Sequence, residues 1–567
     1  MGFQLSPGVN VSEIDLTTVV PSVLTTAGAF AGAFQWGPAN QVVLVDSEIT
    51  LSKTFGKPDS NSAISFFTAA NFLAYGNNLS VVRAVGANSR NALSNPSASV
   101  KVDNSDVFQY SYLSANNTNS YGSFMSRYPG ALGNSLSVHV IDSGPTFSTW
   151  NYSSYFPSAP STSDFALAAG GSNDEMHIVV VDEDGMFTGT KGTVLETYPF
   201  ISKASDASIN GQSNYFKQVI FEKSKYIYAV DPVDYANTAL SWGKPASTSF
   251  VTLAASQSSS LSAGSDAMPV DANTSSAYAH FANKETYDIS LVLTGGANTT
   301  IQQYVIDNVV NSRKDCVAFI SPPMSAVVNN ANNEVSSITS WLSSLARSSS
   351  YVVADSGWKY QYDVYNNTYR WIPLNGDVAG LCVNTDNIRD PWYSPAGFNR
   401  GAIKNAVKLS WNPKKTFRDT IYAAGVNPVV SFPGQGIVLF GDKTLQSKPS
   451  AFDHINVRRL FIVLEKAISN AAQYSLFEFN DEFTRAQFVA LVTPFLRDVQ
   501  GRRGITDFKV VCDTTNNTPQ VIDSNQFVGD IYIKPARSIN YIQLNFVAVG
   551  TGVDFTTVVG ALSLIHI

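Results

Sequence analysis

ISLVL at residues 289–293, VAFI at 317–320 and YVVA at 351–354 are the three apolar runs that decide the fold of this chain. Runs of this length predict buried strands. The segments between them, 300–311 and 334–347, predict helices. Strands that alternate with helices favour a mostly parallel sheet. This part of the sequence therefore predicts an α/β domain.

The beginning of the chain has the same mixture of strands and helix. Residues 41–45 and 79–85 predict strands, and residues 63–75 predict a helix between them. We therefore expect residues 21–87 and 285–397 to form one α/β middle domain, with a core that both parts of the chain build.

Residues 88–284 interrupt this domain and differ from it in amino-acid composition. Connections rich in Ser, Asn and Gly surround short strands, including 177–181 and, after the turn Asp182-Glu183-Asp184-Gly185, residues 186–187. The segment 245–279 is rich in Ser and Ala and predicts a long loop, in which 250–253 could form a short strand. We expect a β-rich inserted region that faces outward.

Residues 398–538 predict a C-terminal α+β core domain. One helix covers 457–472, where apolar residues form a single stripe. A second begins at Asn480-Asp481-Glu482, which suit the exposed N–H groups and the positive dipole end. It is kinked at Pro494 and ends before Gly501. Strands follow at 508–511 and 530–534. The predicted fold class is a multidomain combination of α/β and α+β.

Each end of the chain carries a strand-like arm. We expect residues 1–20 to be an N-terminal linking arm and residues 539–560 a C-terminal linking strand. The apolar side chains that recur along the two arms are Val9, Val11, Ile14 and Leu16, and Ile542, Leu544 and Phe546. Such arms can add to the sheet edge of a neighbour, where main-chain hydrogen bonds give strength. We interpret residues 562–567 as a translated library adapter outside the native protein.

Composition limits the classes of protein to consider. Charged residues make up 14% of the chain, against about 25% in average globular proteins. Interface cores are depleted of charge, so a subunit covered by neighbours fits, as does a secreted protein rich in Ser, Thr and Asn. Cys316, Cys382 and Cys512 are too widely spaced for a disulfide framework or a zinc site. We expect neither export nor a membrane anchor, because no signal-peptide pattern and no apolar run of about 20 residues occurs.

The sequence has no motif with the residue spacing that phosphate binding, calcium binding or hydrolytic catalysis requires. Asp442 interrupts a GxxxxGK[ST]-like sequence at 436–444, which favours a strand and a turn over a phosphate-binding loop. The carboxylates of 182–185 lack the spaced series of an EF-hand, which favours a hairpin turn. No HExxH and no GxSxG occurs. We predict no catalytic, cofactor or metal site, and no enzymatic activity.

Several short motifs resemble those of one known family. They are Pro7-Gly8-Val9-Asn10-Val11-Ser12-Glu13-Ile14-Asp15, Phe398-Asn399-Arg400-Gly401, Asn427-Pro428, Pro433-Gly434-Gln435-Gly436, Gly441-Asp442-Lys443-Thr444-Leu445, Ile455-Asn456-Val457-Arg458-Arg459-Leu460 and Phe479-Asn480-Asp481. In this order they resemble the tail sheath proteins of contractile-tailed, myovirus-type phages. The resemblance covers residues 1 to about 85 and 285 to about 560.

The resemblance implies a structural role and a set of partners. A sheath subunit forms a homo-oligomer of stacked rings around a tail tube, and the sheath stays extended until a baseplate signal lets it contract and drive the tube through the host envelope. The implied partners are other copies of the chain, the tail tube, the baseplate and the tail terminator, without nucleic acid, membrane or cofactor. The implied location is the virion tail, assembled in the host cytoplasm.

Basic residues gather in one part of the chain. Residues 400–503 contain 15 Lys and Arg against 8 Asp and Glu, a net +7, in a chain of net charge −7. This block lacks any nucleic-acid-binding motif, so a protein partner or a solvated face is favoured. The candidate tube-facing residues are Arg458, Arg459, Arg497, Arg502 and Arg503. The alternative is that they pair with Glu465, Asp481 or Asp498 within the sheath.

Other functions stay open at this point. The sheath of a non-phage contractile injection particle would have the same sequence features. A secreted carbohydrate-binding β-protein would explain the Ser, Thr and Asn content, although it predicts a signal peptide. An enzyme with an undetected site predicts titratable residues that converge in a pocket.

Overall fold

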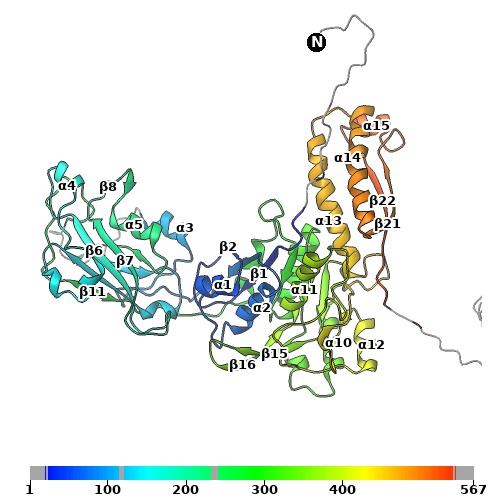
Figure 1. Ribbon diagram of the computed structural model, residues 1–567, viewed down its shortest axis with the longest axis horizontal. Helices are drawn as coiled ribbons and strands as arrows, with labels where there is room; N and C mark the ends of the chain where they lie inside the picture. Colours follow the sequence, from blue (N-terminus) through cyan, green and yellow to red (C-terminus); the bar gives the residue numbers. More distant parts are fainter. Residues whose placement is uncertain (1–19, 21–22, 114–120, 232–240, 541–542, 544–567) are drawn as a thin grey trace, which may run out of the picture.

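The computed structural model describes residues 20, 23–113, 121–231, 241–540 and 543. The molecule is elongated, with the inserted region at one end, a sheet domain in the middle and a pair of long helices at the other end (Figure 1). The predicted arm residues Val9, Val11, Ile14, Leu16, Ile542, Leu544 and Phe546 lie outside the described residues, as do residues 562–567.

The central sheet has seven strands in the order β18-β14-β13-β12-β1-β3-β2. Their bounds are Gly28–Gly32 (β1), Val42–Val45 (β2), Leu79–Arg83 (β3), Leu291–Leu293 (β12), Val317–Ile320 (β13), Val352–Asp355 (β14) and Val426–Asn427 (β18). All neighbours are parallel except β2, which runs antiparallel to β3. Strand β1 pairs with β12, with Gly28 opposite Leu291. The predicted mixed α/β core, built by distant parts of the chain, is confirmed.

Helices cover both faces of this sheet. On one face, α2 (Ala63–Leu73) and α11 (Asn375–Ile388) pack against alternate strand residues in one apolar core. On the other face, α7 (Thr299–Tyr304), which continues through a π-helical turn (Val305–Val310), and α10 (Glu334–Leu345) form a second core. The shorter helices nearby are α1 (Glu48–Phe55), α8 (Asn311–Arg313) and α9 (Met324–Val327). The result is a three-layer domain.

Helix α6 (Asp271–Ala279) corrects the predicted end of the inserted region. It occupies a segment predicted to be loop, and its Tyr278 hydroxyl donates to the Leu293 carbonyl at 2.7 Å. Only Ala277 and Tyr278 of this helix are buried. The sequence therefore has no apolar stripe from which the helix could be predicted. Because both pack with β1 in the second core, the α/β domain resumes at about residue 271 and not at 285.

The inserted region is built on an antiparallel sheet in the order β11-β5-β6-β7. The bounds are Leu136–Asp142 (β5), Glu175–Asp182 (β6), Thr193–Ser202 (β7) and Gln257–Ser260 (β11). Smaller elements around it are α3 (Ser105–Phe108), β4 (Phe124–Ser126), α4 (Asp164–Ala168), β8 (Ser208–Ile209), β9 (Gln212–Ser213), α5 (Phe216–Lys223) and β10 (Ile227–Ala229). This part of the chain is β-rich, as predicted.

Two local predictions in this region are wrong. Residues 186–187 lie in a turn and not in a strand, because the Asp182 carboxylate accepts hydrogen bonds from Phe187 N and Thr188 N and closes the chain there. The strand near the end of the region is β11, not residues 250–253. Leu253 N instead donates to the buried Asp142 carboxylate at 2.9 Å, so its backbone has a side-chain partner.

One buried arginine joins the inserted region to the sheet domain. Arg83, the last residue of β3, donates hydrogen bonds of 2.8–3.0 Å to the carbonyls of Phe34, Gln35 and Gly37 and to that of Pro129. Desolvation lowers its pKa to about 10, although nearby carboxylates oppose this. Backbone carbonyls thus hold a buried cation at the junction, and Pro129 contributes from the inserted region.

The remaining elements are a hairpin of two long helices and several small sheets and short helices, some of which pack against the sheet domain. The helices are α13 (Ile455–Ala472) and α14 (Glu482–Gly501), and Asp481 caps α14 by accepting from Thr484 N at 2.8 Å. The start predicted for this second helix is confirmed, and Pro494 lies inside it. The other elements are β15 (Trp358–Asp363), β16 (Thr368–Pro373), β17 (Lys408–Leu409), α12 (Lys415–Ala423), β19 (Val429–Phe432), β20 (Gly436–Leu439), β21 (Ile505–Val511), α15 (Pro519–Asp523) and β22 (Asp530–Pro535).

Candidate functional site

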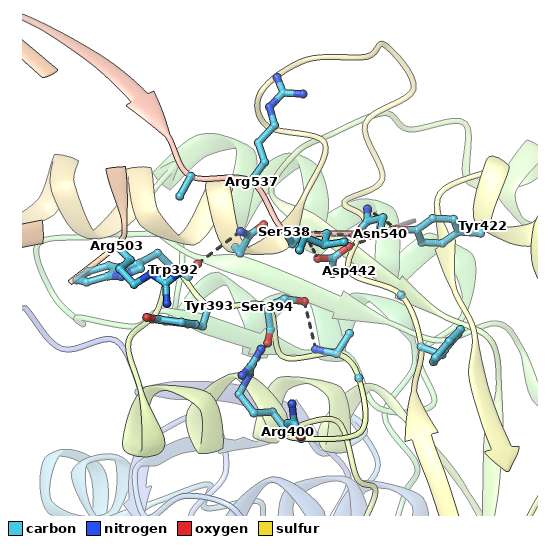
Figure 2. A pocket seen from close by; sticks show the side chains of 18 of the residues that line it. Trp392, Tyr393, Ser394, Arg400, Tyr422, Asp442, Arg503, Arg537, Ser538 and Asn540 are labelled. Carbon is cyan, nitrogen blue, oxygen red and sulfur yellow. Dashed lines mark hydrogen bonds between the residues drawn. The ribbon is translucent and has the colours of Figure 1, made fainter. Parts of the chain in front are cut away.

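A groove of about 1160 Å³ lies in the C-terminal part, at the end of the helix hairpin where α13 begins and α14 ends (Figure 2). We call it the cationic groove. Its lining includes five cations, which are Arg400, Lys415, Arg418, Arg503 and Arg537, and two carboxylates, Asp419 and Asp442. Trp392, Tyr393 and Phe440 add aromatic surface. The volume exceeds the roughly 300–1,000 Å³ of small-molecule pockets, so the groove is large enough to accommodate a segment of another protein chain.

Asp442 is the buried polar centre of this groove. It is 3% exposed and accepts hydrogen bonds from His454 Nδ1 (3.0 Å), Tyr422 Oη (3.3 Å) and Ser538 Oγ (2.9 Å). Burial disfavours the carboxylate, but the hydrogen bond from His454 and the others outweigh it and hold the pKa of Asp442 below its ordinary value. The same bond raises the pKa of His454. The residue that interrupts the phosphate-loop-like sequence is therefore a structural anchor after β20.

The segment 536–540, which includes the first two residues of the predicted C-terminal linking strand (539–560), crosses this groove without forming a strand. Ala536 N donates to the Gly504 carbonyl at 3.1 Å, Ser538 binds Asp442, and Asn540 Nδ2 lies 3.4 Å from the Tyr422 hydroxyl. Figure 2 shows Ser538, Asn540, Asp442 and Tyr422 side by side. These contacts fix the point at which the chain leaves the C-terminal domain.

Most of the groove's cations have no carboxylate partner among the described residues. Arg400 donates to the Ser394 carbonyl at 2.8 Å, and Arg418 lies 5.7 Å and 5.8 Å from the rings of Phe432 and Phe440. Within the described part of the chain, Lys415 alone among the five has an ion pair, at 3.8 Å with Asp419, and both side chains are exposed. Cations without anions favour an acidic partner, because complementary charge promotes encounter and specificity.

Two of the five candidate tube-facing arginines are buried inside the chain. Arg458 and Arg459 are 5% and 4% exposed. The Arg459 guanidinium makes a bidentate pair with Asp386, at 2.8 Å and 2.6 Å, and Arg458 lies 4.3 Å and 3.9 Å from the rings of Tyr351 and Phe452. Their prediction as surface cations is wrong, because the beginning of α13 is covered by the sheet domain rather than by solvent.

The other three arginines lie at the surface where α14 ends. Arg497, Arg502 and Arg503 are all exposed. Arg502 lies 3.3 Å from both Asp390 and Asp498 and 4.9 Å from the Trp392 ring, so part of the predicted pairing within the chain is present. Arg503 lines the cationic groove and has a left-handed backbone, with φ of 68°.

Beside this end of α14 lies a two-stranded antiparallel sheet, in which β21 pairs with β22. Neither outer edge has a strand partner within the described part of the chain. Unpaired edges present backbone N–H and C=O groups to other chains. The edges are therefore candidate acceptors for a strand from another subunit.

Buried titratable groups elsewhere have structural partners within the chain. Lys359 Nζ lies 2.8 Å from Asp377, and both side chains are fully buried. Asp355, which accepts from the Ser321 hydroxyl at 2.6 Å, has a pKa raised by burial to about 8.

Within the described residues, no group of three or more His, Cys, Asp or Glu could hold a metal ion, and no helix combines the length and apolar character needed to cross a membrane.

Three family models match successive parts of the chain. Residues 25–84 match the tail sheath protein Gp18 domain III N-terminal region, residues 271–445 the phage tail sheath protein central domain, and residues 447–548 the phage tail sheath C-terminal domain. The inserted region lies between the first two matches. The central match begins where α6 begins.

Curated relatives match along almost the whole chain. The tail sheath protein of Vibrio phage KVP40 is 33% identical and covers 98% of this chain and 100% of its own length. The tail sheath protein of Enterobacteria phage T4 is also 33% identical, with coverage of 98% and 99%.

Among solved structures, the sheath tail protein of Listeria innocua has the same fold, with a TM-score of 0.52, 10% identity, and coverage of 90% of this chain and 94% of that one. The sheath of an extracellular contractile injection system in the contracted state has a TM-score of 0.50 at 12% identity and covers 96% and 98%. The similarity to the phage relatives extends over 98% of the chain, and by it this protein belongs to the phage tail sheath family.

Proposed function

We propose that this chain polymerises as stacked rings around a tail tube and contracts to drive the tube through the host envelope. The proposal includes a baseplate and a tail terminator at the ends of the polymer, assembly in the host cytoplasm and a final place in the virion tail. The role is structural and involves no catalysis, in keeping with the family.

The sheet β21–β22 is the observation that carries this proposal. Within the described residues neither of its outer edges has a strand partner, and it lies shortly before residues 539–560, the predicted C-terminal linking strand. Two edges can accept two strands, one of each kind of arm, from neighbouring copies. Links of this type hold subunits together while their rigid domains rotate.

Removal of the N-terminal arm tests this proposal. A variant that lacks residues 1–18 should fold as a soluble monomer and fail to polymerise, because one of the two donated strands is missing. Removal of residues 562–567 is the matched control and should leave assembly unchanged. Electron microscopy and sedimentation distinguish monomers from tubes, and normal tubes from the first variant would contradict the role of the arm.

We also propose a tube-facing surface, now limited to Arg497, Arg502 and Arg503. A sheath must hold its tube in the extended state and release it during contraction. Charge attraction suits this requirement better than a large apolar contact, because its strength is modest and its geometry forgiving. Exposure of the three side chains at the end of α14 supports the proposal.

A further inference from the structure

The connection between α13 and α14 exposes an unusual amount of aromatic surface. We call residues 473–483 the hairpin tip. Its large apolar side chains are mostly exposed, and they are Tyr474 (78%), Leu476 (62%), Phe477 (106%), Phe479 (85%) and Phe483 (69%). Clustered exposed apolar residues of this kind mark interaction sites more often than isolated ones do.

The hairpin tip is held in place by polar contacts. Asn480 Nδ2 donates to the Gln526 carbonyl at 2.8 Å, and Arg485 Nη1 donates to the Asn480 side chain at 2.7 Å. Asp481 caps α14. Phe477 has a φ of 71°, a left-handed conformation that is uncommon for a bulky residue. These contacts fix the backbone at the C-terminal side of the tip. The tip can therefore bind a partner with little prior ordering of its backbone.

The charge of the hairpin tip is opposite to that of the cationic groove. Between Lys466 and Arg485 the sequence has no Lys or Arg, but it has Glu478, Asp481 and Glu482. The groove has five cations against two carboxylates, of which Asp442 is buried and fully engaged. Its aromatic side chains and guanidinium groups also suit Phe rings, through edge-to-face and cation–π contacts.

The two surfaces lie at opposite ends of the helix hairpin. Asn456, at the start of α13, and Gln500, at the end of α14, line the groove, whereas the tip joins the other ends of the same helices. Helices of 18 and 20 residues separate the two surfaces by about 27–30 Å at 1.5 Å per residue. The tip of one molecule thus cannot enter its own groove.

We infer that the hairpin tip docks in the cationic groove of a second copy of this chain. Two different surfaces of a subunit that complement each other produce head-to-tail contacts, which extend into open helical polymers when they do not close into rings. The inference rests on the proposed sheath function and specifies one contact by which successive copies stack, apart from the strands that the arms donate.

Cross-linking between two single-cysteine variants tests the contact. One carries Phe479→Cys on the tip and the other carries Arg418→Cys in the groove. The native cysteines, Cys316, Cys382 and Cys512, are all buried, so a short bis-maleimide reacts mainly at the introduced thiols. Polymers assembled from a mixture of the two variants should give covalent dimers on a denaturing gel, whereas polymers of either variant alone should give at least tenfold fewer.

The outcomes separate this inference from the proposed function. Mixed polymers that are normal in electron micrographs but give no dimers would overturn the contact and leave the sheath function standing. Failure of the unmodified chain to polymerise at all would overturn both. Leu16→Cys tests the N-terminal arm as the occupant, and dimers that form from position 418 to position 16 but not to position 479 would also overturn the contact.

Loss of the tip's aromatic side chains gives a second measurement. Phe477→Ser combined with Phe479→Ser removes exposed groups, so folding should be unaffected. Loss of an aromatic anchor should weaken association between copies by about tenfold or more, which shortens the polymers. Tyr110→Ser is the control, because Tyr110 is 95% exposed in the inserted region. Polymers of full length from the tip variant would contradict the inference.

Discussion

Two pairs of adjacent arginines lie at the same end of the helix hairpin in opposite environments. Arg458 and Arg459, in the first turn of α13, are enclosed by aromatic rings and by Asp386. Arg502 and Arg503, after the last turn of α14, are exposed. Both pairs belong to the same basic segment of the sequence. The local density of charge therefore does not distinguish arginines in buried contacts from arginines on a binding surface. The distinction comes from what the rest of the chain places against each helix.

The largest expected effect is on the buried pair. Arg459→Met leaves the Asp386 carboxylate buried without its bidentate partner, which should lower the free energy of unfolding by about 3–5 kcal/mol. Arg497→Met is a matched control on the exposed side and should change it by no more than about 0.5 kcal/mol. Chemical denaturation measures both. Equal effects of the two substitutions would break the comparison.

A smaller effect is expected at His454, the residue before α13. Because Asp442 raises the pKa of His454 above its ordinary value of 6.5, the ionic form of this bond contributes stability that is fully present below pH 6.5. This contribution is lost as the pH rises through the higher folded-state pKa. His454→Gln should therefore flatten the decline of the unfolding midpoint above pH 6.5. A decline identical to that of the unmodified chain would show that another group titrates.

The smallest effect on stability is expected at the exposed arginines. Arg497→Glu combined with Arg502→Glu removes the surface ion pairs of Arg502, which contribute at most about 1 kcal/mol each, and leaves Arg503 in the cationic groove unchanged. Assembly should respond instead. Tube-templated extended sheaths should form poorly at low salt, with a smaller difference from the unmodified chain at high salt because of screening, while tubeless contracted polymers form normally. Equal loss of both assemblies would place the two residues at contacts between sheath subunits.

Five of the seven strands of the central sheet could be predicted because their sequences mark them locally, whereas β1 and β18 were not predicted. Runs such as residues 317–320 are continuously apolar, as expected for strands buried on both faces, and the intervening segments have helical spacing. Helix α6 could not be predicted, since its Ser- and Ala-rich sequence buries only two side chains.

The candidate site was less predictable than the fold. The basic character of residues 400–503 is visible in the sequence, but the cationic groove combines residues from position 392 to position 540. Likewise, the partner that buries Arg459 lies 73 residues away. No local pattern indicates such distant neighbours. The exposed Phe477 and Phe479 were also missed, because aromatic residues next to an apolar helix are expected to join its core.

The pairing of β1 with β12 has a consequence for how the subunit is made. Gly28 and Leu291 are opposite each other in the sheet, although 291 − 28 = 263 residues separate them along the chain. At synthesis rates of roughly 5–20 residues per second, about 13–53 s pass between the synthesis of β1 and that of its partner β12. Long-range pairing of this kind also slows folding, because a large loop must close before the contact forms. During that interval the first strands lack one neighbouring strand. The nascent chain is therefore most prone to misassembly before its middle third has left the ribosome.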